Sequence, residues 1–185
     1  MSAERLFRKL KEALEATGIP YMVTGSFVSA LHGVPRATHD IDVVIAPKAG
    51  QIDALLKEFS TADYYADRDD ALQAFRHETQ FNVIDQHSIW KIDFIIRKER
   101  PFSQVEFARR ATHNILGISV YAASAEDILI AKLEWAKLGE SERQIRDASG
   151  VIEIQGTQLD LAYVERWVTA LGLERQWEAA RQAAG

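Results

Sequence analysis

The sequence predicts an α/β (α+β) protein, in which a short mixed β-sheet with packed helices is followed by a carboxy-terminal helical bundle. Short apolar runs bounded by Pro and Gly alternate with helical stripes through the first two thirds of the chain. The last third shows helical periodicity alone. We therefore expect two regions, 1–122 and 123–185, with a soft boundary near Ala122 to Ser124.

Apolar spacing and breaker residues define the first elements. Leucines at four-residue spacing predict a helix that ends near Gly18, and the apolar run after Pro20 predicts a buried strand. Ser26 can begin the next helix, and Pro47 ends the acidic strand that follows. The expected elements are a helix over 6–16, a strand over 21–24, a helix over 27–32, a strand over 40–45 and a helix over 52–59.

The remaining elements follow from β-rich runs and from capping signatures. A polar Gln-His-Ser turn separates two strand patterns, and Ser124 and Ser141 each stand three residues before a residue that completes a capping signature. Residues 60–80 carry no clear pattern. The expected strands cover 81–85, 89–96 and 118–121, and a helix is expected over 101–110. Ser124 and Ser141 each open a further helix, and two more helices cover 161–171 and 173–184.

Composition excludes several classes of protein. The net charge of −5 argues against broad, nonspecific attraction to nucleic acid. The absence of cysteine excludes a disulfide framework, thiolate chemistry and a cysteine-based zinc site. The amino terminus lacks an apolar signal core, and no stretch approaches the length of a membrane span. We expect a soluble cytoplasmic protein.

Two carboxylates at strand spacing carry the chemical signal. Asp40 and Asp42 should project from one face of their strand, while the residue between them faces the opposite layer. Such a pair suits a hard divalent cation such as Mg²⁺ together with phosphate oxygens. Asp93 on a later strand could complete the metal shell or take a proton from an attacking hydroxyl, and Asp85 is an alternative third acid. The Gly25-Ser26 turn would let backbone amides approach a phosphate at a helix amino terminus.

The motif Gly25-Ser26, followed about a dozen residues later by Asp40-Ile41-Asp42 and then by Asp93, resembles the nucleotidyltransferase superfamily related to DNA polymerase beta. The segment from Gly25 to Asp42 is similar to the small bacterial branch that includes abortive-infection toxin nucleotidyltransferases. Lys132-Leu133 and Arg146-Asp147 stand in the order that those relatives show on two later helices. The resemblance covers most of residues 20–150.

The resemblance implies a nucleotidyltransferase core over 1–122 that binds NTP with Mg²⁺ or Mn²⁺. It implies metal ligation by Asp40 and Asp42, with Asp93 as the third carboxylate, a metal ligand and a catalytic group. Lys132 would reach the triphosphate as a catalytic residue, while Asp147 would help to hold the site. The implied nucleotide contacts are Gly25, Ser26, Lys132 and Asp147. Arg36 and Thr38 either order the loop before the metal strand or contact phosphate or substrate, and we expect the latter. His39 departs from the family pattern, which leaves metal binding intact but puts the substrate preference in question.

The implied reaction moves an NMP from an NTP to a hydroxyl of RNA, a protein or a small molecule, and includes the possibility of a toxin-type enzyme. The alternative is a catalytically weak nucleotide sensor, or a protein that pairs with an antitoxin. Simpler structural interpretations also exist: an edge-strand acid for Asp93, a snorkelling side chain for Lys132 and a solvated charge for Asp147. The histidines fit surface positions better than metal ligation, and the tryptophans fit core positions.

Overall fold

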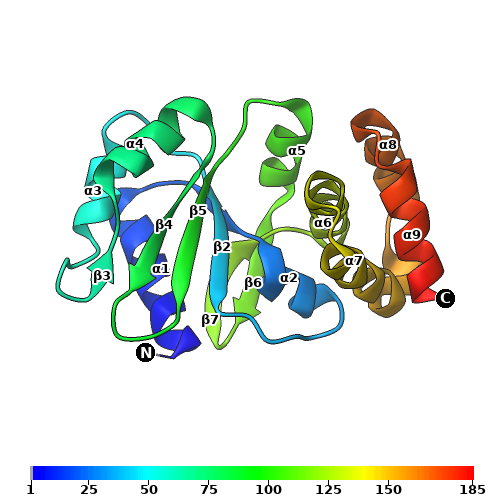
Figure 1. Cartoon of the computed structure of the whole chain (residues 1–185), viewed down its shortest axis with the longest axis horizontal. Helices are drawn as coiled ribbons and strands as arrows, with labels where there is room; N and C mark the ends of the chain where they lie inside the picture. Colours follow the sequence, from blue (N-terminus) through cyan, green and yellow to red (C-terminus); the bar gives the residue numbers. More distant parts are fainter. Residues whose placement is uncertain (1) are drawn as a thin grey trace. The chain divides into compact units, whose positions relative to one another are not determined.

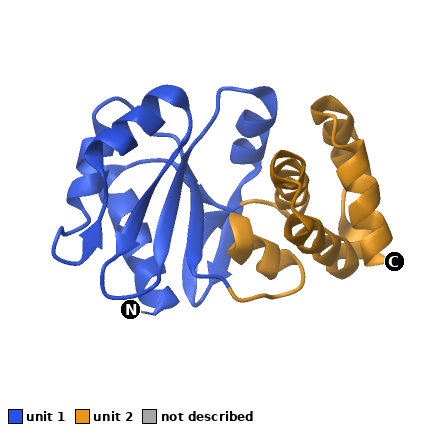
Figure 2. Ribbon diagram, viewed as in Figure 1, with its two compact units in different colours: residues 1–24, 38–122 blue, residues 25–37, 123–185 orange. Residues whose placement is uncertain are grey.

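The computed structural model describes residues 2–185, which divide into two compact units (Figure 2). Unit 1 comprises Met1–Thr24 and Thr38–Ala122, and unit 2 comprises Gly25–Ala37 and Ala123–Gly185. The predicted fold class is confirmed, because unit 1 contains a mixed sheet with packed helices and unit 2 is built from helices. Unit 2 starts its second segment at Ala123 and also takes in the short helix that follows the first strand.

Unit 1 is organised around a seven-stranded sheet of order β3-β4-β5-β2-β1-β7-β6 (Figure 1). The pairs β2–β5 and β1–β7 are parallel, and the other neighbouring pairs are antiparallel. The strands are β1 (Tyr21–Val23), β2 (Asp40–Ile45), β3 (Tyr64–Tyr65), β4 (Gln80–Asp85), β5 (Lys91–Ile96), β6 (Ala111–Ile115) and β7 (Ile118–Ala122).

The central strands have two chemically different faces. On β2, the fully buried Ile41 and Val43 alternate with the partly exposed Asp40 and Asp42. On β5, Phe94 faces the same side as Val43, stacks on Phe81 and makes an edge contact with Phe59 in the core. Because side chains alternate along a strand, the carboxylates lie on the face opposite this core.

Helices α1 (Ala3–Thr17), α3 (Gln51–Lys57), α4 (Arg68–His77) and α5 (Pro101–Arg109) complete unit 1. The first helix begins at the capping residue Ser2, and its C-cap is Gly18, which has a φ of +63°. The contacts α1–α3, α3–α4 and α4–β4 join α1, α3 and α4 to one another and to the β3–β4 end of the sheet. Figure 1 shows α3 and α4 beside that end.

Unit 2 contains α2 (Gly25–His32), α6 (Ala125–Gly139), α7 (Glu142–Gln155), α8 (Leu161–Leu171) and α9 (Glu174–Ala184), with a short 3₁₀ turn at Gly156–Gln158. The predicted cap of α6 is confirmed, since the Asp127 backbone N–H donates to Ser124 Oγ over 3.1 Å. Ser141 is the N-cap of α7, as predicted, but its side chain makes no cap hydrogen bond.

Several elements lie outside the sequence prediction. The strands β3 and β6 and the helix α4 were not predicted. Trp135 was expected in the core, but 49% of its surface is exposed. Within residues 2–185, no helix is both long enough and apolar enough to cross a membrane.

Candidate active site

The two parallel strands β2 and β5 place the predicted carboxylates side by side. Their register pairs Asp42 with Asp93 and Asp40 with Lys91. Residues paired across neighbouring strands lie on the same face of a sheet, so the three acids and Lys91 share the face opposite the core. The structure therefore brings the predicted acidic set together within unit 1.

Asp93 is almost fully buried and is held on one side only. Its Oδ2 accepts a hydrogen bond from Lys91 Nζ over 2.6 Å, and Lys91 Nζ also lies 3.7 Å from Asp40 Oδ1. Asp93 Oδ1 is buried and has no hydrogen-bond partner among the described residues. The expectation of a water-facing edge acid does not hold, because β5 lies between β4 and β2 inside the sheet and Asp93 is only 7% exposed.

The ammonium group of Lys91 is tuned by these acids. Burial acts to lower the pKa of Lys91, but the hydrogen bond to Asp93 and the nearby negative charges outweigh it and hold this pKa above its ordinary value. Lys91 is therefore a cation at neutral pH. The sequence carries a signal for this role: Lys91 precedes Asp93 by two residues, which places both on one strand face.

The acidic set has the oxygen ligands that suit a divalent cation, although its side chains are not grouped as in a formed metal site. Among residues 2–185, no three His, Cys, Asp or Glu side chains are grouped so that they could hold a metal ion. Carboxylate oxygens are nevertheless the ligands that Mg²⁺ prefers. The orphaned Asp93 Oδ1 is an acceptor whose burial costs free energy unless it is satisfied, so the donor set fits a cation.

The predicted phosphate turn lies at the start of α2 in unit 2. Gly25 has a φ of +67°, a left-handed conformation that favours glycine, and the helix begins there. Ser26 is buried, and its Oγ accepts a short hydrogen bond from Arg36 Nη2. The residue before the turn, Thr24, belongs to unit 1, where its N–H donates to the Asp42 carbonyl over 2.9 Å.

A buried ionic network joins three of the other predicted residues. Arg36 Nε donates to Asp147 Oδ1 over 2.8 Å, and its Nη2 donates to Oδ2 over 3.1 Å. Lys132 Nζ donates to the same Oδ2 over 2.8 Å. Burial alone would raise the pKa of Asp147, but the hydrogen bonds from Arg36 and Lys132 outweigh it and hold this pKa below its usual range.

The ionic network decides between the interpretations that the sequence allows for Lys132 and Asp147. Lys132 is 3% exposed, so it does not snorkel to solvent, and its ammonium is paired with Asp147. Asp147 is likewise not a solvated charge. Because Asp147 orients the guanidinium whose Nη2 reaches Ser26, the network connects the helices α6 and α7 with the start of α2.

The other named residues occupy supporting positions. Thr38 Oγ1 accepts a hydrogen bond from the Asp40 backbone N–H over 3.3 Å and so orders the entry to β2. His39 makes an edge contact with Trp90, with ring centroids 5.4 Å apart. Asp85, the alternative third acid, accepts hydrogen bonds from Ser88 Oγ and from the His87 backbone N–H in the β4–β5 turn. These hydrogen bonds within the turn account for the position of Asp85.

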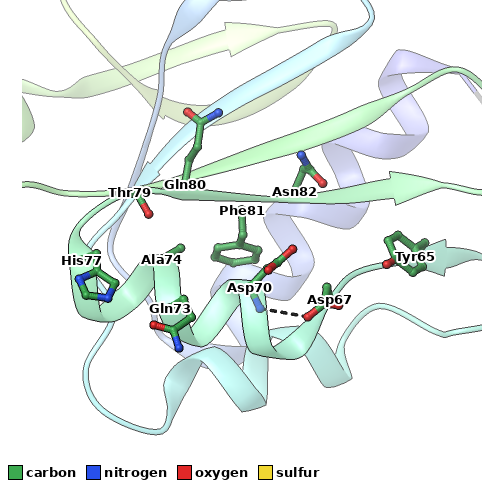
Figure 3. Close-up of a pocket in the computed structure, with 10 residues that line it drawn as sticks. All are labelled: Tyr65, Asp67, Asp70, Gln73, Ala74, His77, Thr79, Gln80, Phe81 and Asn82. Carbon is green, nitrogen blue, oxygen red and sulfur yellow. Dashed lines mark hydrogen bonds between the residues drawn. The ribbon is translucent and has the colours of Figure 1, made fainter.

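A separate cavity of about 480 Å³ lies along the β4 edge of unit 1 (Figure 3). In the figure, Gln80 and Asn82 point to one side of β4, while Phe81 points to the other side, toward α4. Asn82 pairs in register with Asp93, so its side chain lies on the sheet face of the acidic set, whereas Phe81 lies on the α4 face. The cavity is lined by Tyr65, Asp67, Asp70, Gln73, Ala74, His77, Thr79, Gln80, Phe81 and Asn82.

No protein-family model matches this chain. No curated protein matches it either.

Solved structures of nucleotidyltransferases resemble the chain over most of its length. ANT(2'')-Ia in complex with adenylyl-2''-tobramycin has 16% sequence identity and a TM-score of 0.58, covering 94% of this chain and 97% of that one. The lincosamide antibiotic adenylyltransferase LnuA, lincomycin-bound, has 13% identity and a TM-score of 0.56, with 83% and 98% covered. An antigenic nucleotidyltransferase-like protein from Paracoccidioides brasiliensis has 22% identity and a TM-score of 0.54, with 92% and 89% covered. The chain therefore has the nucleotidyltransferase fold.

Proposed function

We propose that the protein is a metal-dependent nucleotidyltransferase that moves an NMP from an NTP to a hydroxyl acceptor. The observation that carries the proposal is the in-register placement of Asp42 beside Asp93, with Asp40 on the same face of the sheet. Three carboxylates on one sheet face, on a fold shared with nucleotidyltransferases, match what nucleotidyl transfer requires.

In this proposal the chain's own residues have separate roles. Asp40, Asp42 and Asp93 would hold Mg²⁺ or Mn²⁺, which when bound would neutralise charge on the phosphates. Asp93 also has a buried, unpartnered oxygen that can accept the proton of the attacking hydroxyl. That hydroxyl forms a new bond to the α-phosphorus of the NTP as the bond to pyrophosphate breaks.

We assign the phosphate contacts to the Gly25-Ser26 turn and to Arg36. Backbone N–H groups at a helix amino terminus, together with a guanidinium, form a suitable site for phosphate oxygens. Lys132 and Asp147 enter the proposal through Arg36, because Asp147 receives hydrogen bonds from both cations. Thr38 supports the metal-binding strand by ordering the backbone of Asp40.

The acceptor we would test first is a small molecule that carries hydroxyl groups. Two of the similar structures contain an antibiotic or its adenylyl product. The net charge of −5 is less favourable for RNA. ATP is the first nucleotide to test, since one of these neighbours is named as an adenylyltransferase.

The test is incubation of the purified protein with each α-labelled NTP, Mg²⁺ and a cell lysate, followed by separation of RNA, protein and small molecules. We expect label in the small-molecule fraction and no transfer by the Asp40→Asn, Asp42→Asn double variant. Label in RNA or protein would instead indicate a toxin-type enzyme or another macromolecular acceptor. Metal-dependent NTP binding in calorimetry, without transfer to any fraction, would indicate a nucleotide sensor.

A further inference from the structure

Lys91 is surrounded by the carboxylates proposed to bind the metal. Its Nζ lies 2.6 Å from Asp93 Oδ2 and 3.7 Å from Asp40 Oδ1. Asp42, the register partner of Asp93, also acts electrostatically on this ammonium. A single cation on β5 therefore offsets part of the charge of three acids on one sheet face.

This position conflicts with a metal ion at the same carboxylates. Mg²⁺ binds oxygen at about 2.0–2.1 Å. A cation bound to the unpartnered Asp93 Oδ1 would therefore lie within a few ångströms of Lys91 Nζ, which is 2.6 Å from Oδ2 of the same carboxylate. Two positive charges at such a separation repel each other, and the repulsion is largest where solvent is excluded. A metal ion at these acids therefore weakens the contact of Lys91 with Asp93.

The side chain of Lys91 is able to move away. It is 36% exposed, whereas that of Asp93 is only 10% exposed. A lysine has a flexible stem and a strongly hydrated head group, so solvent can receive the ammonium when it leaves. Asp93, held in the centre of the sheet, has no comparable freedom.

We infer that Lys91 is an internal counter-ion, which holds the carboxylates together in the metal-free protein and is displaced from Asp93 when a divalent cation binds. This inference rests on the proposed function, because it assumes that these acids bind metal. It gives Lys91 a positioning role: the lysine stabilises the empty acidic set and lowers its affinity for metal.

The experiment measures the affinity of the protein for Mn²⁺, with electron paramagnetic resonance reporting the concentration of free Mn²⁺. We expect Lys91→Met to bind Mn²⁺ roughly tenfold more tightly than the unaltered protein, because a neighbouring positive charge is removed. Lys98→Met makes the same change in net charge at an exposed residue after β5 and should leave the affinity unchanged. Equal or weaker binding by Lys91→Met would overturn the inference.

A second measurement covers the case in which Lys91→Met folds poorly. The second measurement is NMR of the unaltered protein with isotope-labelled lysine side chains. Titration with Mg²⁺ should move the Lys91 resonance from its ion-paired position toward that of a solvated ammonium. A Lys91 signal that stays unchanged at saturating Mg²⁺ would contradict displacement. Melting temperatures give an independent check. Without metal, Lys91→Met should have a lower melting temperature than the unaltered protein. Mn²⁺ should raise the melting temperature of Lys91→Met more than that of the unaltered protein.

The same titrations separate failure of the inference from failure of the proposed function. If the Asp40→Asn, Asp42→Asn variant binds Mn²⁺ as well as the unaltered protein does, the acids are not the metal site and both proposals fail. If that variant loses Mn²⁺ binding but Lys91→Met matches the unaltered protein, the metal site stands and only the role of Lys91 is wrong.

Discussion

Asp93 lies at the centre of the sheet with one oxygen paired to Lys91 and the other buried without a hydrogen-bond partner. An unsatisfied buried acceptor costs folding free energy, typically about 1–3 kcal/mol. Groups that carry such a cost are concentrated at functional sites. This cost is the physical reason for treating Asp93, and not the well-satisfied Asp85, as the third acid.

Replacing Asp93 with Asn should abolish most nucleotidyl transfer while the protein remains folded. The amide cannot take a proton, so we expect the rate to fall about 10²- to 10⁴-fold. The matched variant is Asp85→Asn, which alters a buried acid in the adjoining turn and should keep the rate, with some loss of stability. Rates of α-labelled NMP transfer test both variants, and a larger loss for Asp85→Asn would identify Asp85 as the catalytic acid.

Asp147 should be a main source of stability in unit 2. Its replacement by Asn leaves Lys132 and most of Arg36 buried without a full counter-charge, so we expect a loss of about 3–5 kcal/mol in unfolding free energy at pH 7. The double variant Asp147→Asn, Lys132→Met should recover part of that loss. Urea denaturation measures all three proteins.

The same pair of proteins gives a pH test. The pKa of Asp147 is lowered in the folded state, so its stabilising effect is complete above the unfolded pKa of about 3.9 and is lost as the pH falls through the folded pKa. The stability difference between the unaltered protein and Asp147→Asn should therefore be constant above about pH 5 and shrink below about pH 4. A difference that grows in acid would contradict the ionic network.

At the scale of elements, α2 and α7 approach each other through glycine. A Cβ atom on Gly33 would lie 2.8 Å from the Gly150 carbonyl carbon and 2.8 Å from the Val151 nitrogen. Both contacts are with backbone, which cannot swing aside as a side chain could. The close approach sets the distance between α7 and the end of α2, which precedes the loop carrying Arg36.

Gly33→Ala should therefore destabilise the protein by roughly 1–3 kcal/mol or more, because the helices must separate to admit the methyl group. The control is Gly139→Ala at the end of α6, where an added Cβ meets nothing within 4 Å. That variant should be neutral or stabilising by up to about 1 kcal/mol. Thermal unfolding of the two variants tests this prediction. Equal stability of Gly33→Ala and Gly139→Ala would show that α2 and α7 are not in tight contact at Gly33.

Elements with strong apolar periodicity could be predicted from the sequence, and those without it could not. Helix α4 packs through the small residues Ala71 and Ala74, so it has no clear apolar stripe. Strand β3 has only two residues. Strand β6 lies at the edge of the sheet and buries only Ile115, so most of its residues are polar or small.

The candidate site shows the same limit. The spacing of Asp40 and Asp42 predicts a shared face because strand geometry is local. The bond between Arg36 and Asp147 spans 111 residues, and nothing local in either segment indicates it. The register that places Asp93 beside Asp42 depends on the pairing of β2 with β5, which the sequence alone does not determine.

At the scale of the whole molecule, the fold is shared with nucleotidyltransferases at identities of only 13% to 22%. Such low identity indicates that the alternation of buried and exposed positions, and not individual residues, maintains the architecture. A fold by itself does not establish an activity, so the carboxylates must be tested directly.

The most direct measurement supplies ATP labelled on either the α- or the γ-phosphate, with Mg²⁺ and the acceptor fraction found in the lysate screen. Nucleotidyl transfer predicts that α-label enters the product, that γ-label leaves as pyrophosphate, and that the Asp40→Asn, Asp42→Asn variant makes no product. Gamma-label in the product, or undiminished product from the double variant, would contradict the assignment.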